Sequence, residues 1–171
     1  MLKVLKVIGL VVGIIVLSIV TLLVVARFAD GPWGPISGGS FSSGDAMEKP
    51  ASWDFLKDRQ EVEFELEATG RSRTSWVAVV DGRVFIPSGY MNTPMGKLWK
   101  HWPFDAVEDG RAILRVDNQL YKVNMIRHMD DPALPGVLAE LRRKYFPNVE
   151  GEVPMGEVES GNTWVFELVH R

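Results

Sequence analysis

The clearest pattern along the chain is an unbroken apolar run near its N-terminus. Residues 7–26 are twenty consecutive uncharged and mostly apolar positions. A helix of about 20 residues spans the roughly 30 Å hydrocarbon core of a bilayer. The alternative is a secretory signal peptide, whose apolar region is about 7–15 residues long and ends at a small-x-small cleavage site. This run is longer and continues as Val25-Ala26-Arg27-Phe28-Ala29 without a clean cleavage site. We therefore favour a retained membrane anchor over residues 1–27.

Positive charges flank the apolar run unevenly. Lys3, Lys6 and the amino terminus precede it, and Arg27 alone follows it closely. The flank richer in Lys and Arg stays in the cytoplasm. We therefore expect a single pass through the plasma (inner) membrane, contact with membrane lipid through this helix, a cytoplasmic N-terminus and an extracytoplasmic domain.

A linker follows the apolar run, and apolar and polar positions then alternate with a period of two. Residues 28–52 are rich in Gly, Pro and Ser and predict a linker or wrapping loop. Residues 61–67 then alternate apolar and glutamate positions, which predicts a half-buried strand with its glutamates facing solvent. Five more β-rich runs follow, and turns at Asp81-Gly82 and Asp117-Asn118 join four of them into hairpins. These runs are residues 73–80, 83–87, 112–116, 120–126 and 163–169.

Two segments have helical spacing instead. Residues 97–107 predict a short helix carrying Leu98, Trp99, Trp102 and Val107, with a break or second start at Pro103. Residues 134–146 predict a helix with a basic C-terminal end. Six antiparallel strands and few helices predict a mainly β domain over residues 53–171, folded as a small closed or split barrel with flanking helices. We expect its core to contain Val62, Phe64, Leu66, Val77, Val79, Leu114 and Phe166.

Composition narrows the possible functions. Once Lys3, Lys6 and Arg27 are set apart, the other 144 residues carry 16 basic and 22 acidic side chains, a net charge of −6. Nucleic-acid binding needs clustered positive charge, so we exclude it. The chain has no cysteine, and its three histidines have no metal-ligand spacing, so we predict no metal site. The six tryptophans fill either the core, which we favour, or an aromatic ligand pocket.

One group of basic and small polar residues stands out in this acidic domain. Arg73 and Ser75 lie on one predicted strand with Arg71 just before it, Ser88 and Gly89 follow the next strand, and Lys97 and Lys100 enter a predicted helix. Arginine presents a planar fork of donors to phosphate oxygens. The group therefore fits a phosphate site. The alternative is a set of solvent-exposed cations at strand edges.

The region of the first hairpin also resembles a known family. Residues 74–89 (TSWVAVVDGRVFIPSG), Lys97-Leu98-Trp99 and residues 107–116 (VEDGRAILRV) are similar to the central part of the pyridoxamine 5′-phosphate oxidase-like proteins. The resemblance covers about residues 50–147. It implies a six-stranded antiparallel split barrel, a homodimer, and flavin mononucleotide (FMN) or deazaflavin F420 at the dimer interface. Some relatives bind haem and others bind no known cofactor.

The resemblance also implies roles for individual residues. Arg73 and Ser75 correspond to the strand facing the flavin phosphate, Lys97 and Lys100 to phosphate contacts, and Ser88 and Gly89 to the turn near the isoalloxazine ring. The strand departs from the family pattern at Trp76, whose bulk competes for the space of the ring. The resemblance assigns no catalytic acid or base.

Three hypotheses follow. The first is a membrane-anchored split-barrel flavoprotein, an oxidoreductase whose small-molecule ligand is FMN or a related cofactor. The second is a cofactor-free binding or envelope-interaction module on the same barrel. The third is an unrelated small β-barrel that binds an apolar ligand among its tryptophans.

Overall fold

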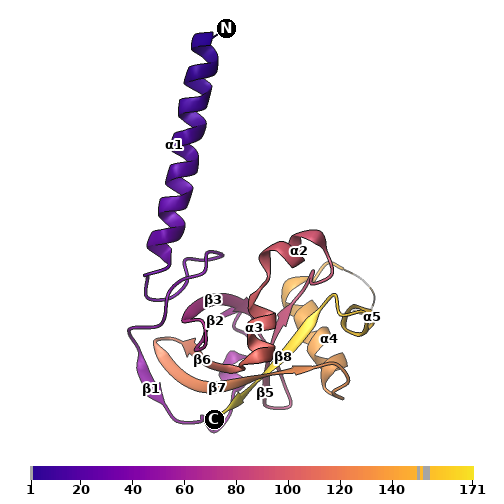
Figure 1. The fold of residues 1–171 in the computed structure, drawn as a ribbon. Helices are drawn as coiled ribbons and strands as arrows, with labels where there is room; N and C mark the ends of the chain where they lie inside the picture. The colour runs from indigo at the N-terminus through magenta and orange to yellow at the C-terminus, as the bar shows by residue number, and fades with distance from the viewer. Residues whose placement is uncertain (1, 150, 152–154) are drawn as a thin grey trace.

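A computed structural model of the chain describes residues 2–149, 151 and 155–171. A long helix, α1 (Leu2–Ala26), projects from a domain built around one curled antiparallel sheet with helices at its sides (Figure 1). In the described part of the chain, α1 is the one helix long and apolar enough to cross a membrane. The sequence-based expectation of a mainly β, barrel-like domain with flanking helices and an apolar N-terminal helix is confirmed.

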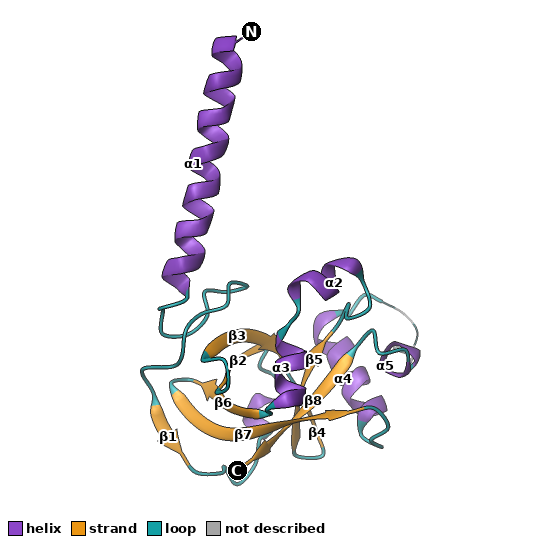
Figure 2. Ribbon diagram, in the orientation of Figure 1, coloured by secondary structure: helices purple, strands orange, loops and turns teal. Residues whose placement is uncertain are grey.

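The sheet contains all six predicted strands, together with two features that the pattern did not predict. The run 73–80 divides into two strands, and a short parallel strand joins the middle of the sheet (Figure 2). The strands are β1 (Asp45–Met47), β2 (Glu61–Leu66), β3 (Arg71–Trp76), β4 (Ala78–Val80), β5 (Arg83–Ser88), β6 (Arg111–Val116), β7 (Gln119–His128) and β8 (Trp164–His170). Their order across the sheet is β3-β2-β6-β7-β8-β5-β4, with β1 paired to β7.

The helices of the domain are short and lie at its sides. Pro94 and Pro103 occupy the first turns of α2 and α3, where proline is tolerated because those N–H groups have no helical partner. The predicted single helix at 97–107 is therefore two helices, with the second start at Pro103. The helical elements are η1 (Asp54–Leu56), α2 (Pro94–Trp99), α3 (Trp102–Glu108), α4 (Leu134–Tyr145) and α5 (Gly156–Glu159).

The sheet curls because one continuous stretch of chain supplies both of its ends. β3 and β4 are the terminal strands of the sheet order, and only Val77 separates them. At Val77 the chain leaves its pairing with β2 and begins pairing with β5. Residues from the end of α4 satisfy the backbone there: Lys144 Nζ donates to the Val77 carbonyl at 2.8 Å, and the Val77 N–H donates to Tyr145 Oη at 2.9 Å.

Two apolar clusters hold the domain together. The first fills the inside of the curl, and all seven predicted core residues (Val62, Phe64, Leu66, Val77, Val79, Leu114 and Phe166) belong to it, which confirms that prediction. The second cluster was not predicted. It packs α4 and α5 against the other face of the sheet through Ala78, Phe85, Leu134, Val137, Leu138, Leu141, Val158 and Val165.

The segment that follows α1 lies across the outer face of β2 and β3. The Gly38 N–H donates to the Ser72 carbonyl at 3.0 Å, and the Phe41 N–H donates to a carboxylate oxygen of Glu65 at 2.7 Å. Glu65 is consequently only 5% exposed. The expectation that the glutamates of β2 face solvent is therefore wrong for Glu65, because that expectation considered the strand without the segment that covers it.

The tryptophans divide between the core and the surface. Trp53 and Trp102 are buried as expected, and Trp102 contacts both Phe64 and Phe166 inside the curl. Trp33, Trp76 and Trp99 are exposed, so core filling is wrong for them. Trp164 is partly buried against the inner cluster.

Candidate functional site

Arg73 is the predicted site residue with the most unusual environment. It lies on β3 opposite Phe64, so its side chain is on the inner face of the sheet. Its Nη1 is buried and has no hydrogen-bond acceptor among the residues that the structure describes. Burial lowers the pKa of Arg73 to about 10, although the carboxylate of Asp105 on α3 opposes this shift. An inward-facing cation with a free donor can accept an anionic ligand.

A second inward-facing arginine is present that sequence analysis missed. Arg127 lies on β7 opposite Phe166, and its guanidinium carbon is 3.5 Å from the centre of the Trp164 ring. Its Nε is buried, and the described part of the chain supplies no acceptor for it. Burial also lowers the pKa of Arg127. A signal was available, because Arg127 continues the inward alternation of Tyr121, Val123 and Met125 along β7.

Helix α3 connects the surroundings of the two arginines. Asp105 on α3 acts on the charge of Arg73, while Phe104 of the same helix packs edge-on to Trp164 at 4.9 Å between ring centres. Arg127 in turn lies over Trp164. The inner face next to α3 therefore combines two cations, whose buried donors have no acceptor within the described ranges, with the aromatic rings of Phe104 and Trp164.

The remaining predicted residues fall into two places. Ser75 of β3 lies opposite Val62 of β2, so its side chain is on the same face of the sheet as that of Arg73. Ser88 is buried at the end of β5, and its hydroxyl contacts the Met91 sulfur at 3.4 Å. Lys100 Nζ donates to the Gly89 carbonyl at 2.7 Å, and burial lowers the pKa of Lys100.

Lys97 is exposed on α2. The structure thus places Ser88, Gly89 and Lys100 together, and Arg73 with Ser75, while Lys97 points into solvent. Trp76 does not lie on the Arg73 face; it stacks on Tyr145 with 4.3 Å between ring centres.

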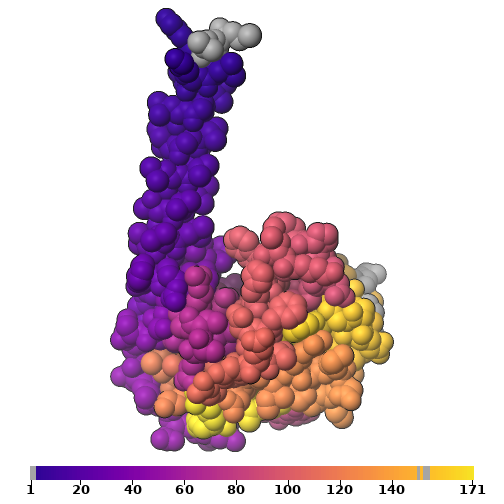
Figure 3. Space-filling model, viewed as in Figure 1, coloured from indigo at the N-terminus to yellow at the C-terminus, as the bar shows by residue number. Residues whose placement is uncertain are grey.

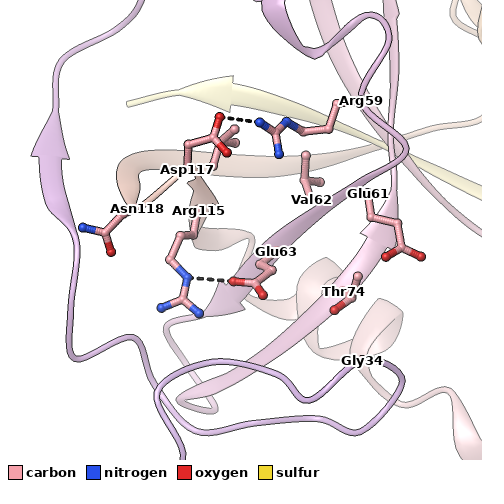
Figure 4. A pocket seen from close by; sticks show the side chains of 10 residues that line it. Gly34, Arg59, Glu61, Val62, Glu63, Thr74, Arg115, Asp117 and Asn118 are labelled. Atoms are coloured by element: carbon pink, nitrogen blue, oxygen red, sulfur yellow. Dashed lines mark hydrogen bonds and ion pairs between the residues drawn. The ribbon is translucent and has the colours of Figure 1, made fainter.

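The larger of two cavities that we describe lies outside this region, between the segment after α1 and strands β2, β3 and β6. It has a volume of about 440 Å³ and a strongly polar lining (Figure 4). Arg115 Nε donates to Glu63 at 2.7 Å, and Arg59 pairs with Asp117. Both arginines are therefore already neutralised by carboxylates, which makes this cavity a poor anion site.

The second cavity, of about 250 Å³, lies beside an ion network. Arg83 donates to both carboxylate oxygens of Asp131, at 3.0 and 2.8 Å, and to those of Glu167 at 2.9 and 2.6 Å. His128 Nε2 lies 2.9 Å from Glu167. Arg83 already pairs with the two carboxylates that a metal ion would need as ligands. The described residues contain no cluster of three potential metal ligands. Neither cavity is lined by any of the six predicted site residues.

No model of a protein family matches the chain, and no curated protein matches its sequence. A solved structure of a conserved hypothetical protein from Mycobacterium tuberculosis is similar, with 13% identity, a TM-score of 0.48, and coverage of 77% of this chain and 85% of that one. A Listeria innocua protein provisionally named a pyridoxamine 5′-phosphate oxidase has 12% identity and a TM-score of 0.41, with 69% of this chain and 89% of that one covered. Similarity at this level identifies neither a ligand nor an activity.

Proposed function

We propose that this chain is a membrane-anchored split-barrel protein of the pyridoxamine 5′-phosphate oxidase-like type, which binds FMN or a related cofactor and serves in oxidoreduction. One observation supports the proposal above the others. On the inner face beside α3, Arg73 and Arg127 each present a buried donor that finds no acceptor among the residues the structure describes. A buried donor without an acceptor carries a desolvation penalty, which a bound anion would remove.

Arg73 and Ser75 would hold the phosphate of the cofactor. Their side chains share one face of β3, and the guanidinium can give paired hydrogen bonds to phosphate oxygens. The domain has a net charge of −6, so a dianionic phosphate needs specific cations rather than a general positive field. Arg127 offers a second such cation, and Trp164 beneath it offers an aromatic surface.

Ser88, Gly89 and Lys100 would border the ring of the cofactor at the end of β5. The bond from Lys100 to the Gly89 carbonyl fixes this turn, and exposed Lys97 would reach the phosphate from α2. A bound flavin supplies the redox chemistry, and the protein residues bind it, orient it and keep water away. The proposal includes a homodimer, the usual form of the family that the sequence resembles.

Anchoring by α1 is part of the same proposal. The helix has the length and composition to span a bilayer, and Lys3 and Lys6 favour a cytoplasmic N-terminus with the domain outside. Arg27 follows α1 directly and donates to the carbonyls of Gly70 and Thr69, at 3.0 and 3.4 Å. The domain would therefore lie close against the membrane surface.

A cofactor-free binding module on the same barrel is the second candidate. It is favoured by the position of the two described cavities, since neither is lined by the residues that would contact a flavin. The visible absorption spectrum of the purified full-length protein in detergent separates the two candidates. A flavin or deazaflavin spectrum supports the proposal. A haem spectrum, or no chromophore together with no uptake of added FMN, would replace it.

A further inference from the structure

Five large hydrophobic side chains outside α1 have a much larger exposed fraction than the other hydrophobic side chains of the domain. Phe28, Tyr90, Met95, Leu98 and Trp99 are 84%, 67%, 71%, 74% and 73% exposed, and no other large hydrophobic described outside α1 exceeds 57%. Four of them lie within ten residues, on α2 and the turn before it. Clustered exposure of this kind marks an interaction surface rather than chance. We call the four residues Tyr90, Met95, Leu98 and Trp99 the α2 patch; Phe28 lies just after α1.

The fold holds the patch outward in a defined shape. Thr93 caps α2 by accepting a hydrogen bond from the Gly96 N–H at 2.9 Å, and the Met91 N–H just before it donates to the Asn162 carbonyl at 2.9 Å. Gly96 packs so closely on Tyr90 that a Cβ there would overlap the Tyr90 carbonyl. The exposure of the patch is therefore built into this segment and does not come from an unstructured loop.

The patch lies on the side of the domain from which α1 leaves. Helix α2 projects toward the N-terminal side and is level with the domain end of α1, while β7 lies on the opposite side (Figures 1 and 2). The space-filling view shows α2 standing out from the domain beside the base of α1 (Figure 3). Phe28 comes two residues after α1 ends, and the bonds of Arg27 to the β2–β3 turn fix that base to the domain.

The composition of the patch matches a membrane–water interface. Tryptophan and tyrosine concentrate at the headgroup level of a bilayer. Residues 90–101 contain no acidic residue, although the domain as a whole is acidic. We propose that the α2 patch lies in the outer surface of the same bilayer that α1 spans. This inference rests on the anchoring by α1 given under Proposed function.

A second copy of the chain is a less suitable occupant. A stable interface buries about 800 Å² and about 20–30 residues on each partner. The patch offers four side chains on a six-residue helix and the turn before it. Contact with a bilayer does not need so large an area, because α1 already holds the patch next to the bilayer.

Single-cysteine labelling tests this inference in the full-length protein, because the natural chain contains no cysteine. Leu98→Cys reports on the patch, Val16→Cys on α1, and Lys122→Cys on exposed β7 as the matched control. Each variant is spin-labelled and placed in phosphatidylcholine–phosphatidylglycerol vesicles. Collision with oxygen, which concentrates in the bilayer, is then compared with collision with a water-soluble nickel complex.

We expect the oxygen-to-nickel ratio at Leu98→Cys to exceed that at Lys122→Cys severalfold and to remain below that at Val16→Cys. A high ratio at Val16→Cys with equal ratios at the other two positions would overturn the inference and leave the anchor intact. A low ratio at Val16→Cys would overturn both. Protection of Leu98→Cys from both reagents, with spin–spin broadening, would assign the patch to a second copy and also overturn the inference.

Discussion

Lys144 Nζ donates to the Val77 carbonyl at 2.8 Å, at the one residue between β3 and β4. The same ammonium group donates to the Arg59 carbonyl at 2.7 Å. Burial lowers the pKa of Lys144, which shows that the charged amine is held there at a desolvation cost. The C-terminal end of α4 therefore fixes the point at which the chain passes from one end of the sheet to the other.

Removal of this amine should weaken the whole domain. Lys144→Met leaves the carbonyls of Leu56, Arg59 and Val77 without their charged donor, and we expect the free energy of unfolding to fall by about 1.5–3 kcal/mol. Chemical denaturation of the detergent-solubilised full-length protein, followed by tryptophan fluorescence, measures the change. Arg143→Met is the control, because the exposed Arg143–Glu140 pair should contribute less than about 1 kcal/mol. Equal effects of the two substitutions would show that the contact with Val77 is unimportant.

The Arg83 network should make stability depend on acidic pH. Hydrogen bonds from Arg83 hold the pKa values of Asp131 and Glu167 below their ordinary values. Their unfolded values are about 3.9 and 4.3, so the stabilisation is fully present above about pH 5 and is lost as the pH falls through the lower folded values. We expect Arg83→Met to cost about 2–3 kcal/mol at neutral pH, with the difference from the parent shrinking below about pH 4. Thermal unfolding of both proteins between pH 7 and 3 measures this.

The matched control for that experiment is Arg111→Met. Arg111 pairs with Asp109 at the surface, so its removal should change the melting temperature little at any pH. A difference between Arg83→Met and the parent that stays constant down to pH 3 would contradict the assigned role of the two carboxylates.

Leu114 tests the inner core. It is fully buried opposite Phe64 on the inside of the curl. Leu114→Ala should lower the free energy of unfolding by about 2–5 kcal/mol, through lost burial and the cavity left behind. Val107→Ala, at a position that is 56% exposed, should change it by less than about 0.5 kcal/mol. Denaturation in the same detergent compares them, and a Leu114→Ala protein that unfolds like the parent would place the core elsewhere.

Local pattern was enough to predict the strands and their inward faces. The alternation around Phe64 and Leu114 is strict, and both side chains are in the inner cluster. The break at Val77 was hidden inside a uniformly β-prone run, because the residues that make it, Lys144 and Tyr145, come 67 and 68 positions later. The sequence shows a strong tendency to form strands there, but not where the pairing partner changes.

The candidate site was less predictable than the fold. Arg73 was selected as one of a group of basic and small polar residues, whereas the burial of its Nη1 away from any acceptor in the described part of the chain depends on what the inner face places around it. Arg127 was overlooked because the inward alternation was followed only to its apolar members. Leu98 was expected only as part of a helix and Trp99 as a core residue, since spacing does not reveal whether an apolar side chain meets protein, solvent or lipid. The environment of each of these side chains is set by contacts with residues far away in the sequence.

Titration of the full-length, detergent-purified protein with FMN, followed by quenching of flavin fluorescence, tests the proposed function most directly. The account predicts saturable binding by the parent and about ten- to a hundredfold weaker binding by Arg73→Ala, since a hydrogen bond to a charged group is worth about 1.5–3 kcal/mol. Arg111→Ala is the matched control, because Arg111 is exposed at the start of β6, where it pairs with Asp109, and its loss should leave the affinity nearly unchanged. Absence of binding by the parent at high micromolar FMN, or binding that Arg73→Ala and Arg111→Ala weaken equally, would contradict the account.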